Sequence, residues 1–354
     1  MSSSPQEVTL RLRPQARFDV IDVAEQLRQE HGDLLGGFKH SLYCSYHTTA
    51  GYFDQHVSAR LQHSGEKLTD FINVFQNVFP RDADYEHDKM HLRSELTEAQ
   101  KASEPLNADS HLTFISSGLR NCVKYDNAEA DPVYFVDLDG VSDRHQRTRK
   151  TTVMAFDREV KVAQATMEVA TNGNRIDSIN LKDAQYGFFE RLDELVQTSG
   201  VEYGRVEISL PPEERHSGLT VNEYETLLMK NDLAEVLHNP LRFAKEKGQN
   251  MLRNPRAVPQ KAHDYAHYDL VRVASEALAM LGFRESLLEK AVARFVAAPA
   301  ARFFRLKRSV NLFITAENGQ GQVAHGTYQS PILLQWQEPE GQRRKLVVTV
   351  KAFE

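Results

Sequence analysis

The chain of 354 residues has few of the features that mark specialised protein classes. Its two cysteines, Cys44 and Cys122, are too few for a disulfide framework and favour a reducing, cytoplasmic location. No apolar run approaches the roughly 20 residues of a membrane span, and no basic stretch precedes an apolar one near the N-terminus. The formal net charge of −6 lacks the basic excess of nucleic-acid-binding proteins. We therefore expect no secretory signal and neither a membrane nor a nucleic acid as partner.

The remaining composition is that of an ordinary globular protein. Hydrophobic residues make up 41% and charged residues 26% of the chain. The length allows two domains with substantial cores. Cys44 lies three residues before His47, which permits a metal-ligand interpretation, although a free cysteine is more often a small buried strand residue.

The first half of the chain predicts a defined order of elements. An alternating strand precedes an amphipathic helix, an apolar strand that ends at His47, a long helix and two closing strands. Apart from the strand ending at His47, these elements are expected at 7–12, 20–27, 54–79, 132–138 and 149–156.

The second half repeats this order, and such internal similarity is the main organisational signal. Its strands are expected at 162–169, 205–210, 310–314, 331–335 and 344–353, and its helices at 184–196 and 221–237. His216 is expected where His47 stands in the first half. We predict two tandem domains, 1–158 and 159–354, joined near 157–161.

An insertion distinguishes the second half, at about 238–308. Two segments within it have helical periodicity, 268–281 and 284–296, and Gly282 between them is a helix stop. Assembly or partner binding is one hypothesis for this insertion.

Four short motifs carry the chemistry-bearing side chains. They are His47-Thr48-Thr49, Asp84-Tyr85-Glu86-His87, Asp109-Ser110-His111 and Gly326-Thr327-Tyr328-Gln329. In this order the motifs resemble those of the YjbQ family, the secondary thiamine-phosphate synthases, whose pattern is roughly His-Thr-Thr, Asp-Tyr-x-His, Asp-x-His and Gly-Thr-Trp-Gln. The chain departs from the pattern at Tyr328, which keeps an aromatic face but puts an indole hydrogen bond in doubt.

The resemblance implies an α+β fold of two tandem YjbQ-like domains. Each domain is expected to have a mixed, mostly antiparallel sheet with two packed helices, and the second to have a helical insertion. Members of the family are expected to be trimers. A homo-oligomer with trimer-like symmetry is therefore predicted.

Histidine is the commonest metal ligand, and each of the first three motifs contains a histidine. His47, His87 and His111 are the expected imidazole ligands, and Asp84 and Asp109 are further ligands or hydrogen-bond acceptors. The expected cofactor is a divalent metal, with zinc preferred and magnesium or manganese as alternatives. A single histidine at a strand end is more often structural, so this interpretation depends on the three motifs together.

Other side chains are expected to act on a small phosphorylated substrate. His47 and His111 are predicted as general acid or base, and Gln329 as a donor to a phosphate or substrate oxygen. The predicted substrate-binding residues are Thr48, Thr49, Ser110, Thr327 and Tyr328. A basic cluster is a further candidate for phosphate binding, although such charges are often only solvated. It comprises Arg144, Arg147, Arg149, Lys150 and Arg215.

Each half lacks motifs that the other keeps. The first half has the three histidine motifs, and the second has Gln329 and His216 but no clear counterpart of His87. We predict one composite site per chain, with histidines from the first half and Gln329 from the second.

Two classes of function follow. The first is a metal-dependent enzyme that, as the resemblance implies, joins a pyrimidine diphosphate to a thiazole phosphate as a weak secondary activity, or a related transferase or hydrolase. The second is a non-catalytic protein derived from that family, which binds a metal or metabolite or serves assembly.

Overall fold

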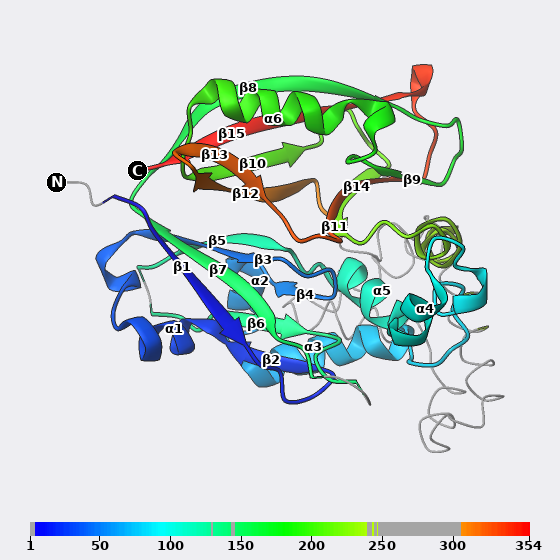
Figure 1. The fold of residues 1–354 in the computed structure, drawn as a ribbon, viewed down its shortest axis with the longest axis horizontal. Helices are drawn as coiled ribbons and strands as arrows, with labels where there is room; N and C mark the ends of the chain where they lie inside the picture. The colour runs from blue at the N-terminus through cyan, green and yellow to red at the C-terminus, as the bar shows by residue number, and fades with distance from the viewer. Residues whose placement is uncertain (1–3, 129, 143–145, 239–242, 244–245, 247–305) are drawn as a thin grey trace, which may run out of the picture. The chain divides into compact units, whose positions relative to one another are not determined.

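The structure is a computed structural model that describes all residues except 1–3, 129, 143–145, 239–242, 244–245 and 247–305 (Figure 1). The fold is α+β with antiparallel sheets and few helices, as the sequence predicts. The chain divides into two compact units. The first comprises Met1–Ala59, Leu119–Glu223 and Lys307–Glu354, and the second comprises Arg60–Gly118 and Tyr224–Leu306. The expected boundary near 158 lies inside the first unit and stays a prediction.

The first half contributes two antiparallel sheets to the first unit. The four-stranded sheet has the spatial order β1 (Gln6–Leu12), β7 (Arg149–Phe156), β3 (His40–Ser45) and β5 (Cys122–Asp126). The three-stranded sheet has the order β2 (Asp19–Asp22), β6 (Tyr134–Asp137) and β4 (Ala50–Tyr52). The strand β2 was not expected: Asp22 ends it and caps α1 (Val23–His31) by accepting from the Glu25 backbone N–H at 3.0 Å.

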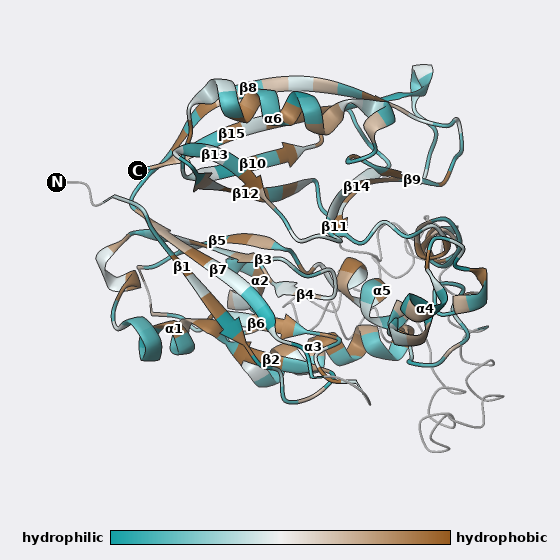
Figure 2. Cartoon of the chain, in the orientation of Figure 1, coloured by the Kyte–Doolittle hydropathy of each residue, from teal (hydrophilic) through white to brown (hydrophobic). Residues whose placement is uncertain are grey.

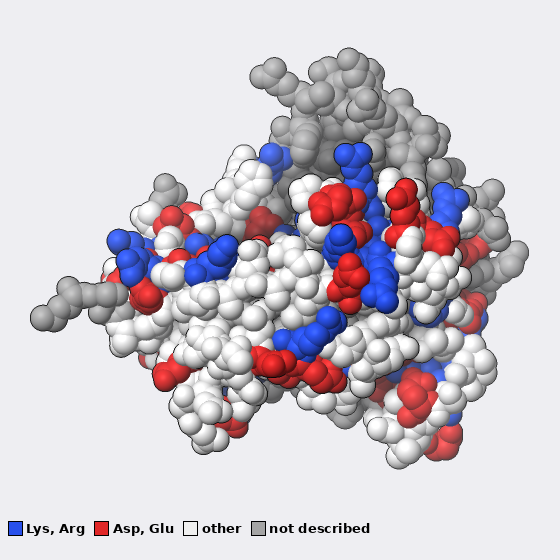
Figure 3. Space-filling view, turned by 90° about the horizontal axis from the view of Figure 1, so that it is seen from above, with Lys and Arg blue, Asp and Glu red and all other residues white. Residues whose placement is uncertain are grey.

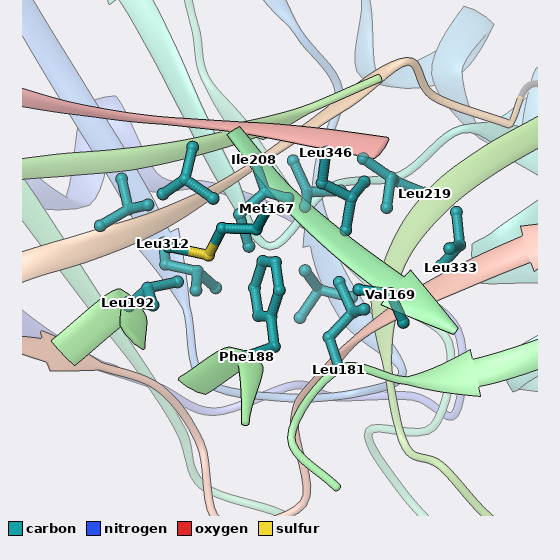
Figure 4. Packing of buried hydrophobic residues seen from close by; sticks show 14 of the residues in the cluster. Met167, Val169, Leu181, Phe188, Leu192, Ile208, Leu219, Leu312, Leu333 and Leu346 are labelled. Atoms are coloured by element: carbon teal, nitrogen blue, oxygen red, sulfur yellow. The ribbon is translucent and has the colours of Figure 1, made fainter. Parts of the chain in front are cut away.

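The second half contributes another pair of sheets to the same unit. The five-stranded sheet has the order β13 (Gln320–Ala324), β12 (Ser309–Glu317), β10 (Gly204–Ser209), β15 (Arg343–Phe353) and β8 (Glu159–Ala170). The three-stranded sheet has the order β11 (Ser217–Asn222), β14 (Ser330–Gln335) and β9 (Asp177–Asn180). The helix α6 (Phe188–Ser199) packs on β8, β13 and β15, and Phe188 and Leu192 enter the core with Met167 and Leu312 (Figure 4).

The two halves have the same strand path. The order β1-β7-β3-β5 corresponds to β8-β15-β10-β12, and β2-β6-β4 corresponds to β9-β14-β11. Only β13 has no counterpart among the described strands of the first half. The alternating hydrophobic pattern of the strands places apolar residues in these sheets in both halves (Figure 2).

An apolar cluster within the first unit joins the halves. It is built from Leu42, Cys44, Cys122, Met154, Phe156, Phe313 and Phe353. The rings of Phe156 and Phe353 stack with centroids 3.9 Å apart. At its edge, Asn121 donates from its side chain to the Asn311 carbonyl at 3.0 Å.

The expectation of free cysteines is wrong. Cys44 and Cys122 are directly opposed in the register of β3 and β5, with Cα atoms 4.4 Å apart, and their sulfurs form a disulfide. The sequence offered no signal for this, because the pairing depends on strand register. Both residues are buried, as expected for Cys44.

The second unit contains helices. The expected helix at 54–79 is divided into α2 (Gln55–Arg60), which begins in the first unit, and α3 (Gly65–Val78), because Gln62 and His63 have positive φ angles. The helices α4 (Glu98–Ser103) and α5 (Ala108–Ser117) follow. The expected helix at 221–237 begins later, as a π-helical turn (Leu227–Asp232) and α7 (Leu233–His238), because 217–222 forms β11.

Most of the predicted insertion, with both of its expected helices, lies outside the described residues. Among the residues that are described, no helix is long and apolar enough to cross a membrane. Figure 3 shows a face of the molecule on which acidic and basic side chains intermingle.

Candidate functional site

The His47 motif forms a short loop between β3 and β4. The Ser45 hydroxyl donates to the Ala50 carbonyl at 2.6 Å and accepts from the His47 backbone N–H at 3.3 Å, which closes the loop. The Lys150 backbone N–H donates to Nε2 of His47 at 2.8 Å. Because Nε2 accepts, the neutral imidazole carries its hydrogen on Nδ1.

Cationic side chains surround this imidazole. Arg149 is buried and donates bidentately to Asp137 at 2.6 and 2.7 Å, while its second terminal nitrogen also reaches the Thr49 hydroxyl at 3.4 Å. Arg147 donates to Asp139 at 2.7 Å. Burial, followed by the charges of Arg149 and Arg147, lowers the pKa of His47 to about 3. The imidazole is therefore neutral at pH 7, beside two arginines whose charges are paired with Asp137 and Asp139.

Gln329 connects this loop to the second half of the chain. Its side-chain amide donates to the carbonyls of Ser45 and His47 at 3.0 and 2.9 Å, and its Oε1 accepts from the Gly326 backbone N–H at 2.9 Å. A Cβ on Gly326 would lie 1.9 Å from the Tyr46 carbonyl oxygen, so glycine permits the close approach. The structure thus brings Gln329 to His47, but the amide holds the loop rather than facing solvent.

The predicted substrate-binding residues near this loop differ in exposure. Thr49 is buried, and the Thr48 carbonyl accepts from the Asn222 side chain at 2.8 Å. Thr327 is exposed, and Tyr328 is 71% exposed. Of the predicted basic cluster, Arg144 lies outside the described residues. Lys150 places its ammonium 4.9 Å from the centroid of the Tyr46 ring. Tyr46 and Lys150 thus place an aromatic ring and an ammonium next to the His47 loop.

The counterpart of His47 in the second half is Glu214, not His216. The Lys345 backbone N–H donates to the Glu214 carboxylate at 2.7 Å, as that of Lys150 does to His47. The His216 carbonyl accepts from the Trp336 backbone N–H at 3.0 Å, as the Thr49 carbonyl accepts from Leu138 at 3.1 Å. The expected alignment of His216 with His47 was therefore wrong by two residues. It matched the two histidines by side-chain type, whereas the backbone hydrogen bonds align His216 with Thr49.

The Glu214 carboxylate at this position is paired with an arginine of the second half. Arg344 donates to its carboxylate at 2.9 Å, and both side chains are largely buried. The Arg215 carbonyl accepts from Arg344 at 3.0 Å. An internal ion pair therefore replaces the neutral imidazole that the first half presents.

The His87 and His111 motifs belong to the second unit and form a buried polar cluster there. Nδ1 of His87 lies 2.8 Å from the Glu225 carboxylate, and Nε2 lies 3.3 Å from Oδ1 of Asn107. The His87 and His111 rings meet edge to face, with centroids 5.4 Å apart. Asp232 accepts from the His87 backbone N–H at 2.9 Å. Both ring nitrogens of His87 are therefore engaged by side chains of this unit.

Burial opposes the charged form of His87, but the hydrogen bond and charge of Glu225, together with Asp88, outweigh it and raise its pKa. Sequence reasoning missed Glu225 and Asp232. Neither belongs to a motif, and both lie over a hundred positions from His87 along the chain.

The remaining predicted residues of this unit have different surroundings. Asp109, Ser110 and His111 lie on α5, whose residues are all buried. Asp84 is instead exposed, and its carboxylate lies 3.7 Å from the Lys89 ammonium. His111 therefore lies within a helix and not at a strand end.

Within the part of the chain that the structure describes, no three His, Cys, Asp or Glu side chains form a group that could hold a metal ion. The nitrogens of His87 and Nε2 of His47 already have partners. The divalent metal stays a prediction.

Comparisons with known proteins concern the fold alone. No protein-family profile matches the chain, and no curated protein does. Solved structures similar to it include proteins described as YbjQ-like or YjbQ/UPF0047. A YbjQ-like protein of unknown function from Sulfolobus solfataricus is 16% identical, with a TM-score of 0.29, over 55% of this chain and 99% of that one. A hypothetical protein from Aeropyrum pernix has the same identity and a TM-score of 0.27, over 54% and 99%.

An uncharacterised YjbQ/UPF0047 protein from Clostridium acetobutylicum is also 16% identical, with a TM-score of 0.24, over 52% of this chain and 98% of that one. TM-scores of this size carry no argument about activity. The chain is similar, at 16% identity and over about half its length, to proteins described as YbjQ-like or as members of the YjbQ/UPF0047 family.

Proposed function

We propose that the chain is an enzyme acting on a small phosphorylated molecule at the His47 loop. The observation that carries this proposal is the pair of hydrogen bonds from Gln329 to the carbonyls of Ser45 and His47. A buried side chain of the second half thus holds a loop of the first half that presents a neutral imidazole. Such construction is typical of a binding site whose polar groups are preorganised.

The charges around His47 select an anion. Lys150, whose ammonium forms no salt bridge among the described residues, attracts a phosphoryl group, and the neutral His47 has its hydrogen on Nδ1, from which it donates to a phosphate oxygen. Binding of the anion offsets the nearby positive charge and raises the pKa of His47. Because Nε2 accepts from the Lys150 backbone N–H, the imidazole stays neutral and acts on a leaving oxygen as a hydrogen-bond donor from Nδ1.

The common strand path supports an origin by fusion of two copies of one domain, as the predicted boundaries 1–158 and 159–354 imply. The Glu214–Arg344 ion pair indicates that the second copy has lost its version of the site. One site per chain, completed by Gln329, follows from this proposal. Assembly into a trimer-like homo-oligomer and a cytoplasmic location belong to the same proposal.

The test is turnover and binding of phosphorylated compounds followed by ³¹P NMR. The panel includes a pyrimidine diphosphate with a thiazole phosphate, the pair that the sequence resemblance implies. We expect His47→Ala to lower turnover by about a hundredfold or more. His31→Ala, which changes an exposed histidine, is the matched control. Turnover that is equal in both variants would overturn the proposal.

Binding without turnover would support the alternative, a non-catalytic metabolite- or metal-binding protein. The fully engaged nitrogens of His87 are the observation that favours this alternative. Metal content of untagged protein, measured by plasma mass spectrometry, tests the predicted zinc, magnesium or manganese.

A further inference from the structure

A cavity of about 90 Å³ is lined by residues of α1, β3 and β5 in the first half of the chain. Its apolar lining includes Leu27 of α1 and the buried residues Tyr43 and Tyr125. The two tyrosine rings meet edge to face, with centroids 5.6 Å apart. Among the described residues that line the cavity, none belongs to the His47 loop. The cavity is thus separate from the proposed active site.

The equivalent positions of the second half carry aliphatic side chains instead. Strand register, counted from the equivalent amides at 150 and 345, places Tyr43 at the position of Ile208 and Tyr125 at that of Leu312. Ile208 and Leu312 lie in one apolar core with Phe188 of α6 (Figure 4). The first half thus has two aromatic rings with polar hydroxyls where the second half has a purely apolar core.

The strand β13 is the second difference between the halves at this place. In the second half, α6 packs against β13, which pairs with β12 from Phe313 onward. Asp126 has the register position of Phe313, but β5 ends there. Asn127, Ala130 and Val133 follow β5 and line the cavity. The cavity therefore begins at the register position where β13 begins to pair in the second half.

Exposed carboxylates stand at the rim of the cavity. Asp33 and Asp126 line it, and neither forms a salt bridge within the part of the chain that the structure describes. Each accepts a backbone N–H from a residue close in sequence, at 3.3 and 3.1 Å. Asp131 is a third carboxyl group in the lining. Arg28 also lines the cavity, but its guanidinium is paired with Glu25. The charge at the rim is therefore negative.

We propose that this cavity binds a small organic ammonium ion, a molecule with an apolar body and a protonated amine. The body contacts the lining formed by Leu27, Tyr43 and Tyr125, where its apolar surface leaves water. The ammonium pairs with Asp33 and Asp126 at the rim, and the negative charge there disfavours an anion of the same shape. The site does not depend on the proposed function, because no residue of the His47 loop takes part in it.

The experiment is NMR of protein with ¹³C-labelled tyrosine rings, titrated at pH 7 with benzylamine, which is protonated, and with its neutral analogue benzyl alcohol. The two signals are identified by their loss in Tyr43→Phe and Tyr125→Phe. We expect benzylamine to shift both signals, and benzyl alcohol to bind about fivefold more weakly, because it cannot pair with the carboxylates. Unshifted signals, or equal affinity for the two probes, would overturn the proposal.

Variants separate this site from a general effect of charge. The double variant Asp33→Asn/Asp126→Asn keeps side-chain oxygens for the two backbone hydrogen bonds and should weaken benzylamine binding about fivefold. Asp70→Asn, an exposed residue of α3 in the other unit, is the control and should leave the affinity unchanged. Equal affinities in these two variants would remove the role of the carboxylates and overturn the proposal.

A second pair of variants tests the place of binding. Ala24 is buried and lines the cavity, so Ala24→Leu fills it and should block the response to benzylamine. His47→Ala should leave the response intact, which distinguishes this site from the proposed active site. A full response in Ala24→Leu, or its loss in His47→Ala, would place the binding elsewhere and overturn the proposal.

Discussion

The side-chain amide of Gln329 donates to the main-chain carbonyl of His47 at 2.9 Å, although 282 positions separate the two residues. The contact joins the last of the four motifs to the first. Because it involves backbone oxygen, it determines the shape of the loop and leaves the imidazole available.

Replacing Gln329 tests this positioning role. Gln329→Ala leaves the buried carbonyls of Ser45 and His47 without their donor, which costs roughly 1–3 kcal/mol. We expect faster hydrogen exchange of the Lys150 backbone amide, because this amide donates to Nε2 of His47. We also expect weaker phosphate binding. Gln322→Ala, on the exposed side of β13, is the control and should change neither. Unaltered exchange at Lys150 in the Gln329 variant would contradict the role.

The close approach of Gly326 to Tyr46 gives a second prediction. An alanine Cβ would lie 1.9 Å from a backbone oxygen, so the turn must move away, at a cost of about 1–3 kcal/mol. Gly326→Ala should therefore lower the midpoint of urea unfolding and weaken phosphate binding. Gly37→Ala is the control, because nothing lies within 4 Å of its Cβ position and the backbone is unstrained. Equal midpoints for the two variants would show that the turn adapts without cost.

The Cys44–Cys122 disulfide should be a large contributor to stability. It closes a segment with a sequence separation of 78, for which the loss of chain entropy in the unfolded state corresponds to about 4 kcal/mol. Dithiothreitol should lower the melting temperature of the wild type but not that of the Cys44→Ala/Cys122→Ala double variant. Two titratable thiols in unfolded protein purified without reductant would contradict the bond. Such a result would instead agree with the reducing compartment expected from composition.

The Glu159 carboxylate should make stability depend on pH. Burial opposes its ionisation, but Arg205, then Lys351 and Lys124, lower its pKa below the ordinary value. A carboxyl with a depressed folded-state pKa stabilises the protein above its unfolded-state pKa and loses that contribution as pH falls through the folded-state value. Glu159→Gln should thus cost about 1–2 kcal/mol at pH 7 and progressively less below pH 4.

The control for this prediction is Glu168→Gln. Glu168 pairs with Arg343 at 3.3 Å, but both side chains are exposed, so the change should be small at every pH. Unfolding in urea at several pH values measures both variants. A pH-independent loss in the Glu159 variant would assign the effect to packing rather than charge.

The sequence by itself determined the α+β class, most strands and the motif order. Alternating apolar residues produced β1, β7, β10 and β15 close to their expected positions, because side-chain burial on one sheet face depends on local periodicity. The motifs also predicted that Gln329 lies near His47, which the hydrogen bond between them confirms. The hydrophobic pattern did not predict where a helix is interrupted. The expected helix at 54–79 is broken at Gln62 and His63, which have positive φ angles.

Tertiary structure alone decided which residues meet. Strand register paired Cys44 with Cys122 and placed Glu214 rather than His216 at the position of His47. Packing brought Glu225 to His87, although no motif links the pair. The physical reason is that a hydrogen bond depends on distances of a few ångströms between side chains, whereas sequence patterns record only the periodicity of each segment.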